Sequence, residues 1–205
     1  MGIFTHWPNR ITAIRFGGAM VLFALFAVAL DRPTEELPQV RGWVNGAFWL
    51  FVVIAATDFL DGYLARRDGN VTAFGRIADP FTDKVLILGT MIFLSAAPWS
   101  RDVLPAWMVV IMLARELLVT GLRGYVESRG GEFPADRWGK LKMILQCIAV
   151  GALFWSHAWA WPEVWSLSWH RLSVGLVWAT LIVTVASGVG YVLKTTRILA
   201  ELEAR

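Results

Sequence analysis

Cysteine and histidine are scarce in this sequence. Cys147 is its single cysteine, so an internal disulfide and a cysteine-based metal site are both excluded. The three histidines, His6, His157 and His170, are scattered and lack the spacing of metal ligands. Any metal site in this chain therefore has to be built from oxygen ligands.

Charged residues are also few, and apolar residues dominate what remains. Charged residues make up 17% of the chain and hydrophobic residues 57%, and the mean hydropathy is +0.55, which is too apolar for an ordinary soluble domain. Windows long enough to cross a bilayer lie at residues 11–30, 43–60, 79–97, 103–126, 141–162 and 172–193. The sequence predicts an all-α integral membrane protein with six transmembrane helices and a single domain over residues 1–205.

The basic residues orient these predicted spans. One side of the six-span arrangement carries Arg10, Arg15, Arg66, Arg67, Arg76, Lys84, Arg123, Arg129, Arg137, Lys140, Lys142, Lys194, Arg197 and Arg205. The other side carries Arg32, Arg41, Arg101 and Arg171. Because basic residues concentrate on the cytoplasmic side, we expect a multi-pass protein of the inner (plasma) membrane with both termini in the cytoplasm. A clustered basic face for nucleic acid is missing, so anionic lipid headgroups are the expected partners of this charge.

Four aspartates bracket the polar connection between the second and third windows. Asp58 and Asp61 are three residues apart, and Asp79 and Asp83 are four apart, so each pair shares one face of its helix. Unpaired carboxylates this close together, at the edge of apolar segments, would repel one another, and a divalent cation removes that repulsion. Oxygen ligands favour Mg²⁺, Mn²⁺ or Ca²⁺ over zinc, and four carboxylates suit two ions.

Basic residues form a second candidate site. Arg115 lies well inside an apolar window, and Arg123 follows it two helical turns later on the same face. A cation at this depth either pairs with an acidic residue such as Glu116 or binds an anionic substrate. Lys140 and Lys142 open the fifth window on the same membrane side and are suited to binding phosphate.

The segment DFLDGYLARRDGNVTAFGRIADPFTD, residues 58–83, resembles the signature of the CDP-alcohol phosphotransferase family. Three further segments are similar to those of one branch, the bacterial phosphatidylglycerophosphate synthases: residues 7–15, 114–125 and 139–146. The chain departs from that branch, without loss of a carboxylate or a basic residue, at Arg10, Phe81, Thr82 and Met143. The resemblance implies six transmembrane helices around a cytoplasm-facing polar cavity, with the active site in the cytoplasm.

The resemblance also implies roles for individual residues. Asp58 and Asp79 would bridge two Mg²⁺ or Mn²⁺ ions, and Asp61 would complete the first metal site. Asp83 would contact the second metal and act as the general base. The residues that would contact CDP-diacylglycerol are Asn9, Thr12, Gly62, Ala65, Arg66, Thr72 and Gly75. Those expected to bind the phosphate of the acceptor are Arg115, Arg123, Lys140 and Lys142.

The implied reaction is phosphatidyl transfer from CDP-diacylglycerol to glycerol 3-phosphate, which gives phosphatidylglycerol phosphate and CMP. Within the family, the acceptor could instead be inositol phosphate, serine or another phosphatidyl group such as phosphatidylglycerol. Outside enzymes, the acidic residues could belong to a divalent-cation transporter. A transporter would need acidic groups that continue across the membrane midplane, whereas those of this chain stop at one side. The sequence leaves the metal used in the cell and the oligomeric state, including a homodimer, open.

Overall fold

The computed structural model describes residues 7–30, 37–68, 73–131 and 137–203, and on the second helix it leaves the side chains of residues 58–68 outside the described part. The described chain is all-helical apart from short turns, which agrees with the predicted fold class. The helices are α1 (Trp7–Leu30), α2 (Leu37–Asp68), α3 (Ala73–Ala96), α4 (Ala106–Ser128), α5 (Arg137–Ala158) and α6 (Glu163–Glu203).

Proline and glycine define the two ends of α4. Pro105 precedes its first residue with φ −68° and ψ 151°, an extended conformation that suits the fixed φ of proline and starts the helix cleanly. At the other end Gly130 has a φ of 77°, a left-handed conformation that favours glycine. The amide of Gly130 donates to the carbonyl of Glu127 and that of Gly131 to the carbonyl of Val126. These bonds satisfy backbone carbonyls that the end of the helix leaves open.

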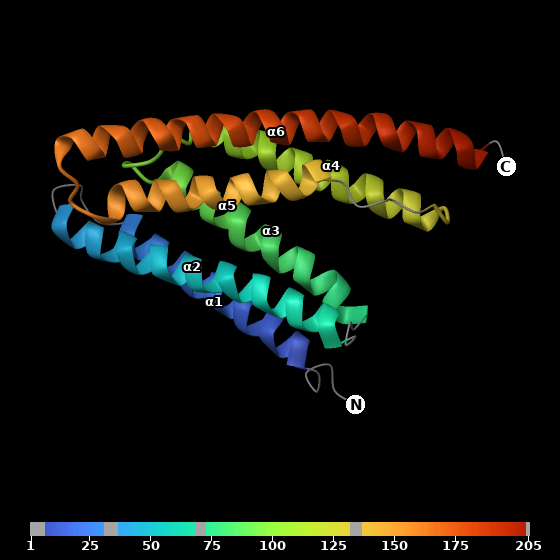
Figure 1. The fold of residues 1–205 in the computed structure, drawn as a ribbon, viewed down its shortest axis with the longest axis horizontal. Helices are drawn as coiled ribbons and strands as arrows, with labels where there is room; N and C mark the ends of the chain where they lie inside the picture. The colour runs from blue at the N-terminus through green and yellow to red at the C-terminus, as the bar shows by residue number, and fades with distance from the viewer. Residues whose placement is uncertain (1–6, 31–36, 69–72, 132–136, 204–205) are drawn as a thin grey trace.

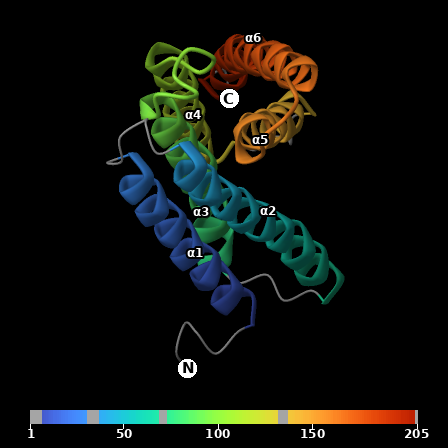
Figure 2. The same ribbon diagram turned by 90° about the vertical axis from the view of Figure 1, so that its left-hand side faces the viewer.

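The helices pack as a closed ring. Around the ring, α1 contacts α2, α2 contacts α5, α5 contacts α6, α6 contacts α4, α4 contacts α3, and α3 returns to α1. In Figure 1, α3 runs between the α1–α2 pair and the group formed by α4, α5 and α6, and it also contacts α5. Figure 2 shows α1 and α2 below α4, α5 and α6. Helices that are distant in the sequence are therefore neighbours, as in the α4–α6 and α2–α5 pairs.

One end of the bundle gathers the helix ends that carry the candidate residues. In Figure 1 the start of α1, the end of α2, the starts of α3 and α5, and the ends of α4 and α6 all lie toward the right-hand side. The described helices therefore alternate in direction along the chain, so the start of α1, the end of α6 and the helix ends that carry the candidate residues lie at the same end of the bundle.

Four of the described helices are long and apolar enough to cross a membrane: α1, α2, α5 and α6. The helices α3 and α4, with 24 and 23 residues, carry charged side chains within their apolar stretches. On α3 these include Asp79, Asp83 and Lys84, and on α4 they include Arg115 and Glu116. The residues that break the apolar pattern are largely those of the candidate sites.

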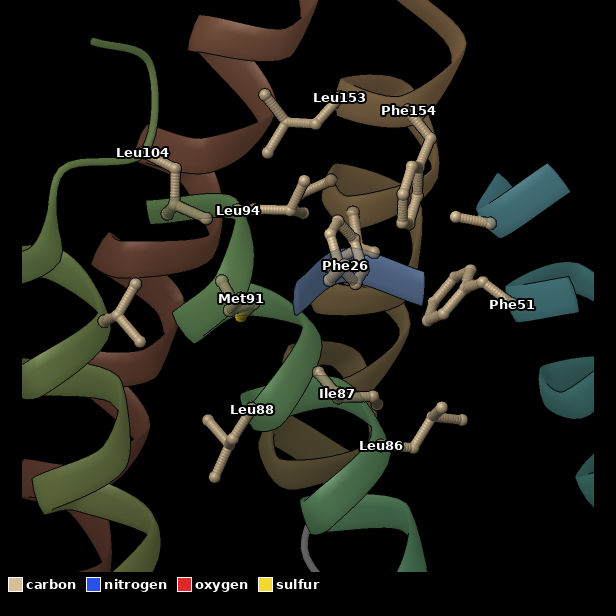
Figure 3. Close-up of a cluster of buried hydrophobic side chains, with 14 of the residues drawn as sticks. Phe26, Phe51, Leu86, Ile87, Leu88, Met91, Leu94, Leu104, Leu153 and Phe154 are labelled. Atoms are coloured by element: carbon tan, nitrogen blue, oxygen red, sulfur yellow. The ribbon is translucent and has the colours of Figure 1, made fainter. Parts of the chain in front are cut away.

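The core fixes how the ring is assembled. Phe154 of α5 lies 5.5 Å from Phe26 of α1 and 5.8 Å from Phe51 of α2, measured between ring centroids, and Figure 3 shows the three rings together. At Gly89 of α3, an added Cβ would lie only 2.2 Å from the ring of Phe23, so glycine permits the close approach of α1 and α3. This approach brings the start of α1 against the start of α3, where the predicted carboxylates lie.

Candidate active site

Two aspartates on α3 face two polar residues on α1. Thr12 Oγ1 donates a hydrogen bond to Asp79 Oδ1 at 2.5 Å, and Arg15 pairs with Asp83 through Nη2 and Oδ1. Thr12 and Arg15 share one face of α1, and the two aspartates share one face of α3. Both α1 residues are buried, with Arg15 only 2% exposed. The α1 face therefore orients both carboxylates at the interior of the bundle.

The other predicted metal ligands lie on α2. Asp58 and Asp61 belong to this helix, but their side chains lie outside the described residues. Among the side chains that the structure describes, no group of three or more His, Cys, Asp or Glu comes together, and these include only two of the four aspartates. Helix α2, which carries Asp58 and Asp61, packs against α1, and α1 also contacts Asp79 and Asp83. The prediction of a four-aspartate site remains open.

The described half of the acidic set fits a hard divalent cation. Carboxylate oxygens are the ligands that Mg²⁺ and Mn²⁺ prefer. Asp79 and Asp83 present such oxygens from a single helix face, and each is oriented by a donor from α1. Ligands whose own hydrogen bonds fix their direction are typical of metal sites.

The residues predicted to contact CDP-diacylglycerol are only partly described. Asn9, Thr12 and Gly75 are buried at the start of α1 and of α3. Thr12 contacts a predicted metal ligand directly, which adds an orienting role to the one that the sequence predicts. The remaining residues of this set lie outside the described residues, as side chains on α2 or in the connection after it: Gly62, Ala65, Arg66 and Thr72.

Arg115 is fixed between α4 and α6. Its Nη1 donates to Glu116 Oε1 at 2.8 Å and its Nη2 to Ser187 Oγ at 2.9 Å. Its guanidinium carbon lies 5.2 Å from the centre of the Tyr191 ring, within range of a cation–π contact. A Cβ at Gly188 would lie 3.0 Å from Arg115 Cγ, so the absence of a side chain there leaves space for the arginine stem.

Glu116 joins two cations from different helices. Lys142 of α5 donates its Nζ to the same oxygen, Oε1, that accepts from Arg115. Arg115, Glu116 and Lys142 are 8%, 6% and 6% exposed, so this group is buried where α4, α5 and α6 meet. The pairing of Arg115 with Glu116 confirms one of the two sequence-based interpretations of this arginine. It leaves anion binding open, because two cations share one carboxylate.

Two further cations extend this group. Arg123 is exposed and donates its Nη2 to Tyr191 Oη at 3.3 Å, so both arginines of α4 contact the same tyrosine. Lys84 directly follows Asp83 on α3 and donates to Thr120 Oγ1 at 2.6 Å, and Thr120 in turn donates to the carbonyl of Glu116. Lys84 thus connects the acidic face of α3 to the basic residues of α4. Lys140, also predicted for this site, is exposed at the start of α5.

Sequence reasoning missed three residues of this arrangement. Lys84 had a usable signal, since it follows a predicted metal ligand directly. Ser187 and Tyr191 had none, because they lie about 70 residues from the arginines that they contact and carry no local motif. Only the packing of α6 against α4 reveals them.

Comparison with known proteins identifies the family. A model of CDP-alcohol phosphatidyltransferases matches residues 5–186. The chain is 34% identical over 194 residues to the CDP-diacylglycerol--glycerol-3-phosphate 3-phosphatidyltransferase of Bacillus subtilis, covering 91% of this chain and 93% of the relative. It is 40% identical over 189 residues to a probable phosphatidylglycerophosphate synthase of Mycobacterium tuberculosis, covering 92% and 81%. A 3-phosphatidyltransferase of the first type from Rickettsia felis is 40% identical over 153 residues, covering 75% and 77%.

The family match includes every described residue of the acidic face and the basic residues of α4 and α5. The match spans all four segments that resemble the family, and the two relatives are aligned over 93% and 81% of their own length. The chain belongs to the CDP-alcohol phosphatidyltransferase family.

Proposed function

We propose that the chain transfers the phosphatidyl group of CDP-diacylglycerol to glycerol 3-phosphate, which forms phosphatidylglycerol phosphate and releases CMP. The relatives from Bacillus subtilis and Rickettsia felis carry the name of this activity, which supports the assignment. Membership of an enzyme family decides against the alternative of a divalent-cation transporter.

The observation that carries the choice of acceptor is the charge around Glu116. Arg115 and Lys142 both bond to this carboxylate. Lys84 bonds to Thr120, which donates to the backbone carbonyl of Glu116. Arg123 bonds to the hydroxyl of Tyr191, the ring that Arg115 also contacts. Arg115 and Lys142 are two cations that share one carboxylate, which leaves one positive charge in excess beside Lys84, and this basic surrounding complements the dianion of a phosphate monoester. Serine and glycerol carry no phosphate, so this charge favours glycerol 3-phosphate over either of them. Two competitors also carry a phosphate: inositol phosphate has the same phosphate monoester, and phosphatidylglycerol has a phosphodiester with a single negative charge.

The reaction assigns distinct work to the acidic face. Asp83 takes the proton from the attacking hydroxyl of glycerol 3-phosphate, and Arg15 keeps its carboxylate directed into the bundle. Thr12 fixes Asp79 in the same way. Two Mg²⁺ or Mn²⁺ ions, when bound, would neutralise the pyrophosphate and the charge that develops on it. The residues proposed to hold these ions are Asp58, Asp61, Asp79 and Asp83.

Lys84 lies between the two candidate sites. Its backbone follows Asp83, and its ammonium group contacts α4 near the basic residues. An acceptor whose phosphate lies near Arg115 and Lys142 would therefore extend its hydroxyl toward Asp83 along α3. This direction separates the binding of the phosphate from the chemistry at the hydroxyl.

We further propose that all six helices cross the inner membrane, with the active site and both termini in the cytoplasm. At 1.5 Å per residue, α3 and α4 are each about 35 Å long, enough for a hydrocarbon core of about 30 Å. The charged residues within the apolar stretches of these two helices contact neighbouring helices or one another: Asp79, Asp83, Lys84, Arg115 and Glu116. The order of the helix ends in Figure 1 supports a common side for the termini and the acidic connection.

A comparison of acceptors, each given separately, tests the proposed function. Purified protein in detergent is given CDP-diacylglycerol, Mg²⁺ and one of glycerol 3-phosphate, inositol phosphate, serine or glycerol, and CMP release is measured. We expect glycerol 3-phosphate to react best and glycerol poorly, because glycerol has the hydroxyls without the phosphate. Lys142→Met should raise the KM for glycerol 3-phosphate about tenfold or more and leave the KM for CDP-diacylglycerol nearly unchanged. Arg129→Gln, at an exposed arginine that directly follows α4 and contacts Tyr125, is the matched control.

A further inference from the structure

Glu116 is a buried carboxylate that the reaction itself does not require. It lies inside the ring on α4 and is 6% exposed. Burying a charge is unfavourable unless it is paired, and replacing a buried ion pair by apolar residues is often neutral or stabilising. A purely structural role needs one cation to balance one carboxylate. Glu116 instead holds two, Arg115 and Lys142, so the buried group keeps one positive charge in excess.

The two cations are held at a spacing that suits a phosphate group. Both Arg115 Nη1 and Lys142 Nζ bond to Glu116 Oε1, so the two nitrogens lie within about two hydrogen-bond lengths, roughly 5–6 Å, of each other. Different oxygens of one phosphate can accept from two donors at such a separation. Without a carboxylate between them, the two cations would repel, and Lys142 has a flexible stem that allows it to move away.

An unpaired donor in the same group is suited to an anionic ligand. Arg115 Nε is buried and has no hydrogen-bond partner in the described structure, although Nη1 and Nη2 of the same guanidinium are both bonded. The great majority of buried donors in proteins have a hydrogen-bond partner. The hydrogen bond to Ser187, the contact with the Tyr191 ring and the close approach of Gly188 hold this arginine in place. Its Nε therefore cannot easily turn toward another protein group. An oxygen of a bound phosphate would satisfy it.

We propose that Glu116 is a positioning residue that holds Arg115 and Lys142 together as a preformed receptor for the acceptor phosphate. Its carboxylate does not contact the phosphate, which carries charge of the same sign. Glu116 keeps the two cations side by side from α4 and α5 before the acceptor arrives. This inference rests on the proposed function for the identity of the acceptor, and it adds the device by which the site is kept ready.

The test is Glu116→Gln, which preserves shape and removes the charge. We expect the KM for glycerol 3-phosphate to rise about tenfold or more, with less than a threefold change in the KM for CDP-diacylglycerol. Glycerol 3-phosphate should also raise the unfolding temperature of the wild type and fail to raise that of the variant at the same concentration. Glu116→Asp should recover part of the affinity, since it keeps the charge. Glu127→Gln, at an exposed glutamate of the same helix, is the matched control and should behave as the wild type.

Besides an unchanged KM for glycerol 3-phosphate, three results would overturn the inference. A fall in the KM for glycerol 3-phosphate would mean that Glu116 competes with the phosphate. Equal increases in both KM values, together with a lower unfolding temperature, would make its role structural. The double variant Glu116→Gln with Lys142→Met removes one charge of each sign and tests folding separately: it should fold normally and still bind glycerol 3-phosphate weakly. Full recovery of affinity in the double variant would exclude Lys142 from the receptor.

The proposed function can fail separately from this inference. A wild type that prefers serine or glycerol in the acceptor comparison refutes glycerol 3-phosphate as the acceptor, whatever Glu116 does. A wild type that is specific for glycerol 3-phosphate, combined with an unchanged KM in Glu116→Gln, refutes the positioning role alone.

Discussion

Replacing Arg15 with methionine tests how α1 controls the proposed general base. Arg15 is 2% exposed and pairs with Asp83, whose side chain is 23% exposed. Methionine keeps much of the length and the apolar stem of the arginine while it removes the charge. Asp83 then loses the group that directs its carboxylate into the bundle.

The partial exposure of Asp83 sets the expected size of the effect on stability. Breaking a fully buried ion pair by removing one partner costs about 3–5 kcal/mol. Because water reaches part of the Asp83 side chain, we expect a smaller loss for Arg15→Met, about 1–3 kcal/mol. Turnover should fall more steeply than stability, by roughly 10–100-fold, since a misdirected base loses much of the 10²–10⁴-fold that general-base catalysis contributes. Arg15→Lys should recover part of both losses because it keeps the charge.

The assay combines thermal unfolding in detergent with CMP release at saturating CDP-diacylglycerol and glycerol 3-phosphate. Arg171→Met, at an exposed arginine of α6 far along the chain from the site, is the control and should leave both measurements unchanged. An Arg15→Met protein with the stability and the turnover of the wild type would show that Asp83 does not depend on α1, and the reasoning from this ion pair would be wrong.

The remaining predictions concern the metals, the aspartates and the packing of α3. Removing divalent cations with a chelator should abolish CMP release, and Mg²⁺ or Mn²⁺ should restore it; undiminished turnover after chelation contradicts a metal site. Asp83→Asn should lower turnover by about two to four orders of magnitude while nucleotide binding survives better, whereas Asp79→Asn should damage both, and equal small effects refute this division. Gly89→Ala should destabilise the protein by about 1–3 kcal/mol in thermal unfolding, because the new Cβ meets the Phe23 ring; an unchanged unfolding temperature contradicts the close approach of α1 and α3.

The sequence was sufficient for the helices but not for their full lengths. The predicted windows fall within or close to the six described helices, yet α6 runs from Glu163 to Glu203, well beyond the predicted 172–193. Hydropathy detects only the apolar part of a helix, whereas α6 continues through polar residues at both ends. The predicted window 141–162 instead runs past the end of its helix, because α5 ends at Ala158 and Pro162 lies in the connection that follows.

The acidic face shows what local spacing can and cannot predict. The spacing of Asp79 and Asp83 placed both on one face of α3, and their contacts with α1 confirm that they point the same way. Their partners Thr12 and Arg15 lie more than 60 residues earlier, and only tertiary packing brings them together. The roles of Asp58 and Asp61 stay predictions, since their side chains lie outside the described residues.

Identification of the lipid product tests the central claim most directly. Purified protein is incubated with CDP-diacylglycerol, Mg²⁺ and glycerol 3-phosphate labelled in its phosphate, and the lipid fraction is analysed by mass spectrometry and for label. We predict one labelled lipid with the mass of phosphatidylglycerol phosphate, formed in equal amount to CMP and reduced at least a hundredfold in Asp83→Asn. Release of CMP without label in the lipid fraction would contradict phosphatidyl transfer to glycerol 3-phosphate.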